Sequence, residues 1–160
     1  MIIKKTLSVD KEWLTEIMTA AFNFDTTYHR KDTAEDGPPG YNDGSLAERM
    51  LADADLSIYI IEVDCENIGF LSFFVSEQIG IVEKFCIDPK YIGQGIGTQA
   101  WKLFEEQESV AKWQLETPDY STRNHRFYEK CGFHKIGEKK YSEDSCSFIY
   151  EKCLENNKKL

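Results

Sequence analysis

The sequence predicts a single domain of the α/β (α+β) class, in which helices cover a β-sheet. Residues 56–63 and 68–75 form two nearly continuous apolar runs around a polar turn, a pattern typical of a hairpin buried on both faces. Residues 81–101 combine a β-branched run, a glycine-rich turn and apolar residues at helical spacing. The chain of 160 residues suits one domain with its own core.

A strand and an amphipathic helix are expected at the start of the chain. Residues 2–7 form the strand, and Ser8 or Asp10 can cap the helix that follows, because either side chain can accept hydrogen bonds from the first turn. Apolar residues at positions i, i+3, i+4 and i+7 predict a face buried in the core: Leu14, Ile17, Met18 and Ala21.

A long loop and a short second helix are expected next. Residues 24–44 lack periodicity and contain several glycines and prolines, so the sequence predicts a mobile loop whose length is typical of functional segments. Residues 45–48, Ser-Leu-Ala-Glu, match a capping box in which the serine and the glutamate satisfy each other's backbone N–H groups. The second helix should therefore begin there and reach about residue 54.

The central unit is a strand, a glycine-rich turn and a helix. Residues 81–87 form the strand, with Ile81, Phe85 and Ile87 expected on one face, and Pro89 ends it. Glycines then alternate up to the helix start: Gly93, Gly95 and Gly97. A helix N-terminus offers unpaired N–H groups and a positive dipole end, so this turn is a candidate site for a phosphate or pyrophosphate. A tight connection without any ligand is the alternative.

The last third of the chain predicts three further strands and a helix. Residues 112–116 form a short strand that stops near Pro118, and residues 121–131 form a helix that Gly132 can end. Residues 133–141 and 145–153 are the closing strands, and residues 154–160 are expected to be a frayed tail.

Two motifs resemble those of the GNAT superfamily of N-acetyltransferases. Residues 92–97, Ile-Gly-Gln-Gly-Ile-Gly, are similar to its acetyl-CoA turn, with Ile92 replacing the usual arginine or glutamine. Residues 124–133 resemble its terminal helix, which ends in Tyr-Glu-Lys-x-Gly-Phe. The resemblance implies a mixed, mostly antiparallel twisted sheet of about seven strands flanked by about four helices, with one domain over residues 1–160.

The resemblance also implies an acetyl-CoA-dependent N-acetyltransferase that transfers the acetyl group directly in a ternary complex. The pantetheine arm would follow the backbone of Phe85, Cys86 and Ile87. The pyrophosphate would bind to the turn that comprises Gly93, Gln94, Gly95, Ile96, Gly97 and Thr98. Many relatives place an asparagine that contacts pantetheine where this chain has Ser121, and Asn124 could make that contact instead. The acceptor, a small-molecule amine or a protein amine, is not indicated.

Three residues are candidates for catalysis. Tyr128 matches the family position whose phenol protonates the leaving thiolate, although it could instead be a core tyrosine. Glu116, at the end of its strand, and Glu83, in an otherwise apolar run, are alternative bases, and a carboxylate among apolar groups tends towards a raised pKa. Cys86 is expected to be inert packing.

The family resemblance also gives the long loop a role. In GNAT proteins the region between the first two helices forms part of the acceptor site. Tyr28, His29 and Tyr41 could therefore face the acceptor.

Composition narrows the range of partners. A net charge of −9 argues against nucleic acid and anionic membranes, which bind basic surfaces. Five cysteines without a Cys-x-x-Cys pair favour reduced thiols over a disulfide framework or a metal site. The first residues show neither a signal peptide nor a membrane span, so a cytoplasmic protein is expected. A homodimer is compatible with the sequence.

Two other functions are compatible with parts of the sequence. A Rossmann unit would explain why Gly93-x-Gly95 precedes a helix and why Glu116 follows at roughly the expected distance. However, Thr98 replaces the third glycine, and the remaining chain is too short for a doubly wound sheet. A non-catalytic acyl-CoA-binding or regulatory module is the second alternative, and the presence of Tyr128 with two candidate bases favours an enzyme over it.

Overall fold

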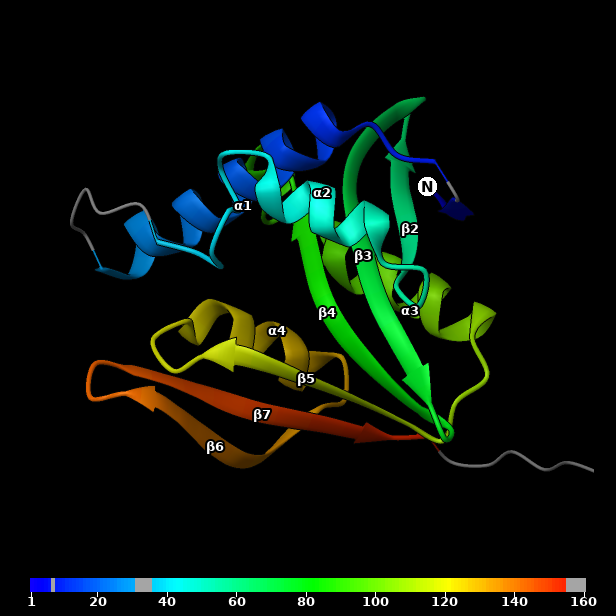
Figure 1. Cartoon of the computed structure of the whole chain (residues 1–160). Coiled ribbons are helices and arrows are strands. Elements are labelled where there is room, and N and C mark those ends of the chain that lie inside the picture. The colour runs from blue at the N-terminus through cyan, green and yellow to red at the C-terminus, as the bar shows by residue number, and fades with distance from the viewer. Residues whose placement is uncertain (7, 31–35, 155–160) are drawn as a thin grey trace, which may run out of the picture.

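The structure is a computed structural model that describes residues 1–6, 8–30 and 36–154. Its strands, in chain order, are β1 (Ile2–Thr6), β2 (Ser57–Val63), β3 (Glu66–Ser76), β4 (Ile79–Ile87), β5 (Lys112–Pro118), β6 (His134–Ser142) and β7 (Ser145–Cys153). They form one sheet in the order β1-β2-β3-β4-β5-β7-β6 (Figure 1). Only the β4–β5 pair is parallel among the described strands.

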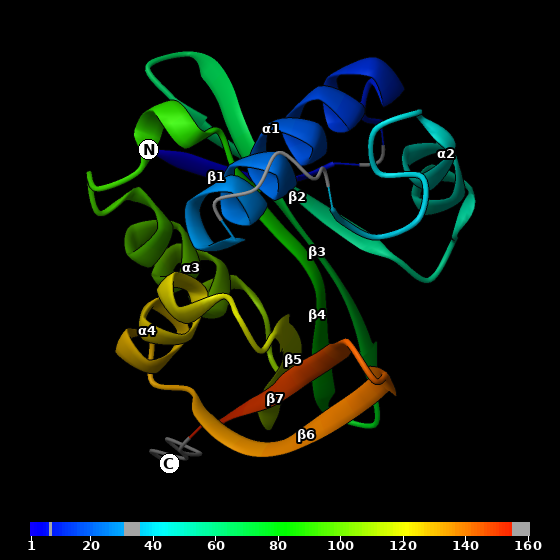
Figure 2. The ribbon, with the colours of Figure 1, turned by 90° about the vertical axis from the view of Figure 1, so that its left-hand side faces the viewer.

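The helices are α1 (Lys11–Arg30), α2 (Ser45–Ala52), α3 (Ile96–Gln107) and α4 (Thr122–Lys130), and a short 3₁₀ turn covers Pro89–Tyr91. Figure 2 shows α1 crossing the sheet near β3 and β4, with α3 and α4 beside each other. The predicted fold, a mostly antiparallel mixed sheet flanked by helices, is confirmed.

Two hydrophobic clusters lie on opposite faces of the sheet. The cluster beneath α1 and α2 is mainly aliphatic and includes Leu14, Met18, Met50, Ile60 and Phe70. The cluster beneath α3 and α4 is rich in aromatic residues and includes Phe73, Trp101, Phe104, Trp113 and Tyr150. The ring centroids of Phe104 and Trp113 are 4.8 Å apart, within the range at which aromatic pairs stabilise a core beyond simple burial. Strands β2 and β3 are buried on both faces, as expected from their apolar runs.

Helix α1 is longer than the sequence suggested. It continues to Arg30, so the prediction of a loop from residue 24 is wrong for residues 24–30, and residues 31–35 of that loop lie outside the described residues. The buried face goes on beyond Ala21 with polar side chains: Asp25, at 8% exposed, and Thr26, at 1%. Because hydrophobic periodicity detects only apolar stripes, it could not reveal this half of the helix.

The helix starts show which cap predictions hold. Asp10 caps α1, because its Oδ1 accepts a hydrogen bond from the Glu12 N–H at 3.1 Å. The capping box at Ser45 is wrong: Gly44 is the cap residue of α2, and Ser45 donates from both its N–H and its hydroxyl to Asp43. The Asp43 carboxylate therefore takes the part expected of Glu48, whereas the Glu48 N–H donates to the Gly44 carbonyl at 3.0 Å instead of to the serine hydroxyl. Helix α2 ends at Ala52 rather than near residue 54.

The β2–β3 hairpin is tighter than expected. Strand β3 begins at Glu66, so the turn consists of Asp64 and Cys65 rather than four residues. Both have positive φ, 50° and 64°, which is the backbone of a two-residue type I′ turn that matches the twist of the strands.

Strand β4 contains a β-bulge at Glu83. In the pairing with β3, Ser72 lies opposite Lys84 and Phe73 lies opposite Val82. Glu83 is therefore the extra residue of β4. A bulge of one residue exchanges the two faces of a strand, because side chains alternate with a period of two.

The bulge corrects the predicted face of this strand. Val82 packs in the same cluster as Phe85 and Ile87, whereas Ile81 is 40% exposed. The expectation that Ile81, Phe85 and Ile87 share one face is therefore wrong for Ile81. An uninterrupted period of two was assumed, and the bulge breaks it.

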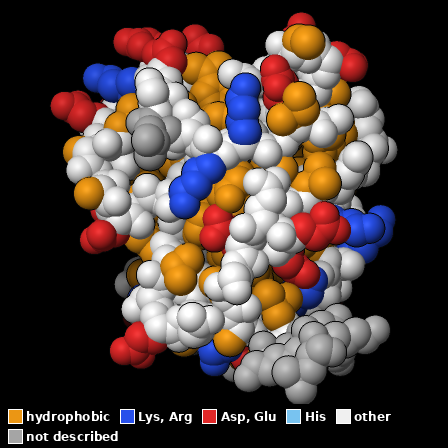
Figure 3. Space-filling model, turned by 90° about the vertical axis from the view of Figure 1, so that its right-hand side faces the viewer, with side chains coloured by type: hydrophobic (Ala, Val, Ile, Leu, Met, Phe, Trp, Pro, Cys, Tyr) orange, Lys and Arg blue, Asp and Glu red, His pale blue; other side chains and the backbone are white. Residues whose placement is uncertain are grey.

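Charged side chains are dispersed on the side of the molecule shown in Figure 3. Lysines and arginines are scattered among acidic side chains there, with no extended basic area. Within residues 1–6, 8–30 and 36–154, no helix combines the length and the apolar character that crossing a membrane requires.

We predict that Gly80→Ala will destabilise the fold. A Cβ at Gly80 would lie 2.2 Å from Cζ3 of the buried Trp113, so the core would have to shift. Overpacking of this kind lowers the free energy of unfolding by about 1–3 kcal/mol. Gly137→Ala is the matched control, since the nearest atom to its Cβ is 3.9 Å away. Urea unfolding of both variants tests this, and equal stability would contradict it.

Candidate active site

A cavity of about 1440 Å³ opens where β4 and β5 separate. The two strands pair at three positions, ending with Ile81 opposite Gln114, and within the described chain no pairing between them follows. Figure 1 shows them diverging from this point. Other walls come from the second half of α1, residues 36–39, the turn before α3, helix α4 and the β6–β7 hairpin. One edge of the second half of β4 therefore faces the cavity instead of a neighbouring strand.

The glycine turn forms one end of this cavity. Gly93 and Gly95 have φ of +81° and +74°, a conformation that side chains disfavour, and a Cβ at either would meet no atom within 4 Å. Gly95 is the cap residue of α3, and the first hydrogen bond within that helix runs from the Gln99 N–H to the Gly95 carbonyl. The N–H groups of residues 96–98 precede that bond and can bind an anion.

The other residues of the motif have different roles. Gly97 allows α3 to pack on α4, because a Cβ there would lie 3.0 Å from the Phe127 ring. The side chain of Gln94 turns away and donates to the Lys90 carbonyl at 3.3 Å. The cavity is lined by all the predicted cofactor residues except Gln94: Phe85, Cys86, Ile87, Gly93, Gly95, Ile96, Gly97, Thr98 and Asn124.

Cys86 is not a nucleophile. Its side chain is 3% exposed, and burial raises the pKa of its thiol to about 12. The thiol therefore stays protonated near neutral pH, and a protonated thiol is a poor nucleophile. Its expected role as inert packing agrees with this environment.

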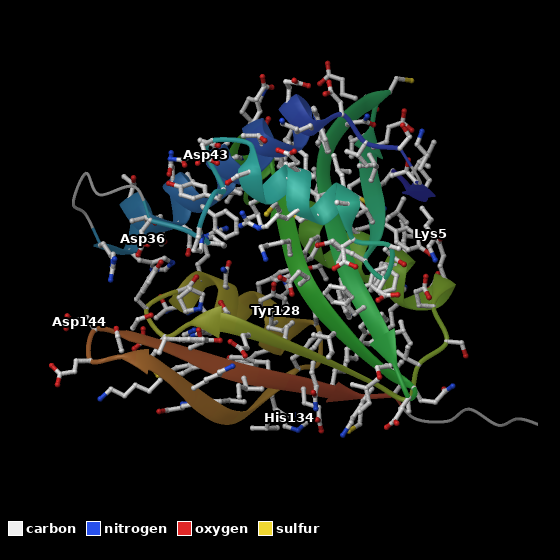
Figure 4. All side chains as sticks on the ribbon, viewed as in Figure 1. Lys5, Asp36, Asp43, Tyr128, His134 and Asp144 are labelled. Atoms are coloured by element: carbon white, nitrogen blue, oxygen red, sulfur yellow. The ribbon has the colours of Figure 1, made fainter. Side chains whose placement is uncertain are left out.

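Tyr128 belongs both to the core and to the cavity wall. Its ring packs against Phe127 and Phe133, and the side chain lines the cavity between β4 and β5 (Figure 4). Burial raises the pKa of the phenol, and the nearby Cys86 thiol adds to the shift. The phenol therefore keeps its proton at neutral pH, as a proton donor requires.

Both candidate bases reach the cavity, but neither has apolar surroundings. Glu116 accepts a hydrogen bond from the Tyr141 hydroxyl and lies 3.9 Å from Lys139 Nζ. Glu83, at the bulge, accepts a hydrogen bond from Lys84 Nζ at 2.9 Å. The glutamate side chains are 40% and 41% exposed. The expectation that Glu83 sits among apolar groups is therefore wrong.

A buried polar cluster, which the sequence analysis missed, joins α1 to α4. Asp25 accepts a hydrogen bond from the Ser121 hydroxyl at 2.9 Å, and Arg123 Nη2 lies 3.9 Å from the same oxygen. His29 Nε2 is 3.3 Å from Asp25 without hydrogen-bond alignment. Burial lowers the pKa of His29, partly offset by the Asp25 carboxylate, so the ring is neutral at pH 7. Continuation of the α1 stripe by Asp25 and His29 was the signal that could have revealed this cluster.

The three residues expected to face an acceptor do not line the cavity in the described structure. Tyr28 is 56% exposed, and Tyr41 is buried, with its hydroxyl donating to Asn23 at 2.6 Å. The His29 side chain belongs to the polar cluster just described. The wall that α1 contributes is formed instead by Ala21, Phe22, Phe24, Asp25 and Arg30.

Potential metal ligands do not cluster in the described structure. Among residues 1–6, 8–30 and 36–154, no group of three or more His, Cys, Asp or Glu residues could hold an ion.

We predict that Asp25→Ala will destabilise the protein, because it leaves the fully buried Ser121 hydroxyl without its acceptor. Losing a buried hydrogen bond to a charged group lowers the free energy of unfolding by about 1.5–3 kcal/mol. Glu16→Ala, at an exposed position of the same helix, is the control and should change it by less than about 0.5 kcal/mol. Thermal or urea unfolding would contradict the role of Asp25 if both variants behaved alike.

Comparison with known proteins agrees with this architecture. Residues 54–135 match the family model described as an acetyltransferase (GNAT) domain. The chain is 36% identical over 107 residues to the uncharacterized protein YrkN of Bacillus subtilis, a match that covers 64% of this chain and 56% of that relative. The chain thus matches little more than half the length of that relative.

Solved structures share the fold at low sequence identity. The ribosomal-protein-S18-alanine N-acetyltransferase of Escherichia coli aligns with a TM-score of 0.71 and 17% identity, covering 95% of this chain and 92% of that one. The PaiA N-acetyltransferase of Thermoplasma acidophilum, in complex with coenzyme A, aligns with a TM-score of 0.64 and 19% identity, covering 96% and 100%. An aminoglycoside 6′-N-acetyltransferase complexed with coenzyme A gives 0.68 and 15%, covering 96% and 97%.

The family match covers just over half of the 160 residues, and it contains both the diverging strand and the glycine turn. The seven-stranded sheet with its parallel β4–β5 pair agrees with it. The chain belongs to the GNAT acetyltransferase family.

Proposed function

We propose that the protein transfers an acetyl group from acetyl-CoA directly to a primary amine of an acceptor bound in the same cavity. The divergence of β4 and β5 carries this proposal, because it leaves a strand edge in the same cavity as the glycine turn and Tyr128. Two structures with the same fold hold coenzyme A, which supports the assignment of the cofactor.

The free edge of β4 suits the amide groups of a pantetheine arm, which would add to the strand as an extra neighbour. Phe85, Cys86 and Ile87 would supply the backbone groups, and the turn of residues 93–98 would hold the pyrophosphate. Asn124 lines the cavity, whereas the Ser121 hydroxyl is buried and donates to Asp25. We therefore assign the pantetheine contact of α4 to Asn124.

The reaction requires two proton transfers. The acceptor amine gives up a proton to Glu116 or Glu83 as its nitrogen bonds to the thioester carbon. The C–S bond then breaks, and Tyr128 protonates the departing thiolate. Holding both substrates in one cavity supplies a large part of the rate enhancement.

Replacing Gly95 with valine should abolish acetyl-CoA binding. A branched side chain would project into the open side of the turn, and φ of +74° is unfavourable for valine. The far-ultraviolet circular dichroism spectrum should stay native. Gly137→Val, in an exposed hairpin strand, should bind normally. Calorimetry that finds native affinity in a folded Gly95→Val variant would rule out the turn as the cofactor site.

Replacing Tyr128 with phenylalanine should lower kcat by about 10²–10⁴-fold, the usual loss of a general acid. Acetyl-CoA affinity and Tm should change little, because the ring and its packing remain. Tyr59→Phe is the control, since Tyr59 is also buried but donates to Glu108 outside the cavity. A Tyr128→Phe enzyme with near-native kcat, when chemistry limits the rate, would exclude the acid role.

The experiment that tests the function itself is the release of free CoA from acetyl-CoA over a panel of amines. The panel should include small amines, aminoglycosides and peptides with free N-termini, since the names of the related structures include both a protein acceptor and an aminoglycoside. Acceptor-dependent release would support an enzyme. Tight acetyl-CoA binding with no release for any acceptor would favour a non-catalytic acyl-CoA-binding or regulatory module.

A further inference from the structure

Lys84 is a lysine of the cavity wall whose side chain is largely covered. Its side chain is only 10% exposed, yet it lines the cavity. Its Nζ donates to Glu83 Oε1 at 2.9 Å and to the Glu83 backbone carbonyl at 3.4 Å. An ammonium has three N–H donors, and in the described part of the chain Glu83 is the only partner for them. The remaining donor is available to an acceptor atom of a ligand in the cavity that Lys84 lines.

The β-bulge explains how the cation and its partner come together. Neighbouring residues of a regular strand point to opposite faces, but at the bulge Glu83 and Lys84 contact each other, and both line the cavity. Ser72, which lies opposite Lys84 on β3, is small and fully buried, so it leaves room for the lysine stem. One wall of the cavity therefore presents an anion and a cation side by side.

We propose that the Glu83–Lys84 pair selects an acceptor whose amine and carboxylate sit on one carbon, that is, a free α-amino acid. This inference rests on the proposed function and specifies its acceptor. The Lys84 ammonium would bind the carboxylate, and the Glu83 carboxylate would accept a hydrogen bond from the ammonium of the amino acid. The pair and the zwitterion are each neutral overall, so binding would bury no uncompensated charge.

The position of the pair suits this role. Glu83 lies on the unpaired edge of β4, two residues after the last β4–β5 pair and two residues before Phe85, the first residue assigned to the pantetheine arm. An amine bound there would be next to the edge assigned to pantetheine. A diamine fits less well, because Lys84 would repel a second cationic group near the reacting one.

The test compares matched acceptors in the CoA-release assay. Each α-amino acid is paired with the amine that lacks only its carboxylate: phenylalanine with phenethylamine, leucine with isoamylamine, and lysine with cadaverine. The corresponding α-amino amides form a third arm. For the best side chain we expect kcat/KM to favour the acid over the amine by at least about tenfold, as one charge-assisted hydrogen bond would give.

Lys84→Met should bring this ratio close to one, whereas Lys84→Arg should keep most of it. Lys102→Met, an exposed lysine on α3, is the control and should leave the ratio unchanged. Acetyl-CoA affinity and Tm of each variant are measured alongside, so that a folding defect is recognised. If Lys84→Met fails to fold, the Lys84→Arg result and the three-arm comparison on the unmodified protein decide.

Each result has a distinct meaning. Equal turnover of acids and amines, equal turnover of acids and amides, or an unchanged ratio in a folded Lys84→Met variant would overturn the assignment while leaving the acetyltransferase function intact. No CoA release with any amine would overturn the proposed function, and the acceptor assignment with it.

Discussion

The structure depends on the point at which β4 and β5 stop pairing. Buried backbone N–H and C=O groups need partners, and a sheet normally supplies them on both edges of a central strand. Here the parallel pair ends after three positions, and the second half of β4 faces a cavity. The unpaired edge is a ready site for an extended amide-containing ligand, and the walls around it come from α1, the turn before α3, α4 and the β6–β7 hairpin.

The divergence is stabilised by packing on one side and by polar contacts on the other. Below α3 and α4, an aromatic cluster supports β4 and β5 near the place where they still pair. The Trp113 ring packs directly against the backbone of Gly80 there. Across the open end, Asp25 and Ser121 connect α1 to α4. The connection between α1 and α4 is therefore polar, whereas the support beneath α3 and α4 is apolar.

The sequence revealed features that depend on local backbone requirements, and it missed features that depend on tertiary contacts. The glycine turn and the terminal helix were predictable because their signals are local in the sequence. Glycine indicates a positive φ or a helix end, and side chains at helical spacing indicate a helix. The bulge at Glu83 has no such local sequence signal, because the extra residue is defined only by the register of β4 against β3. The second half of α1 was missed because its buried residues, Asp25 and Thr26, are polar. The capping box at Ser45 was wrong because Asp43, rather than Glu48, accepts a hydrogen bond from the Ser45 N–H.

The central claim is that the free edge of β4 and the start of α3 together hold acetyl-CoA. Amide hydrogen exchange, followed by NMR at single-residue resolution with and without saturating acetyl-CoA, tests this most directly. The account predicts slower exchange at residues 85–87 and 96–98 in the complex, with little change on the far edge strand β1. Demonstrated binding that leaves the exchange of both segments unchanged would contradict it.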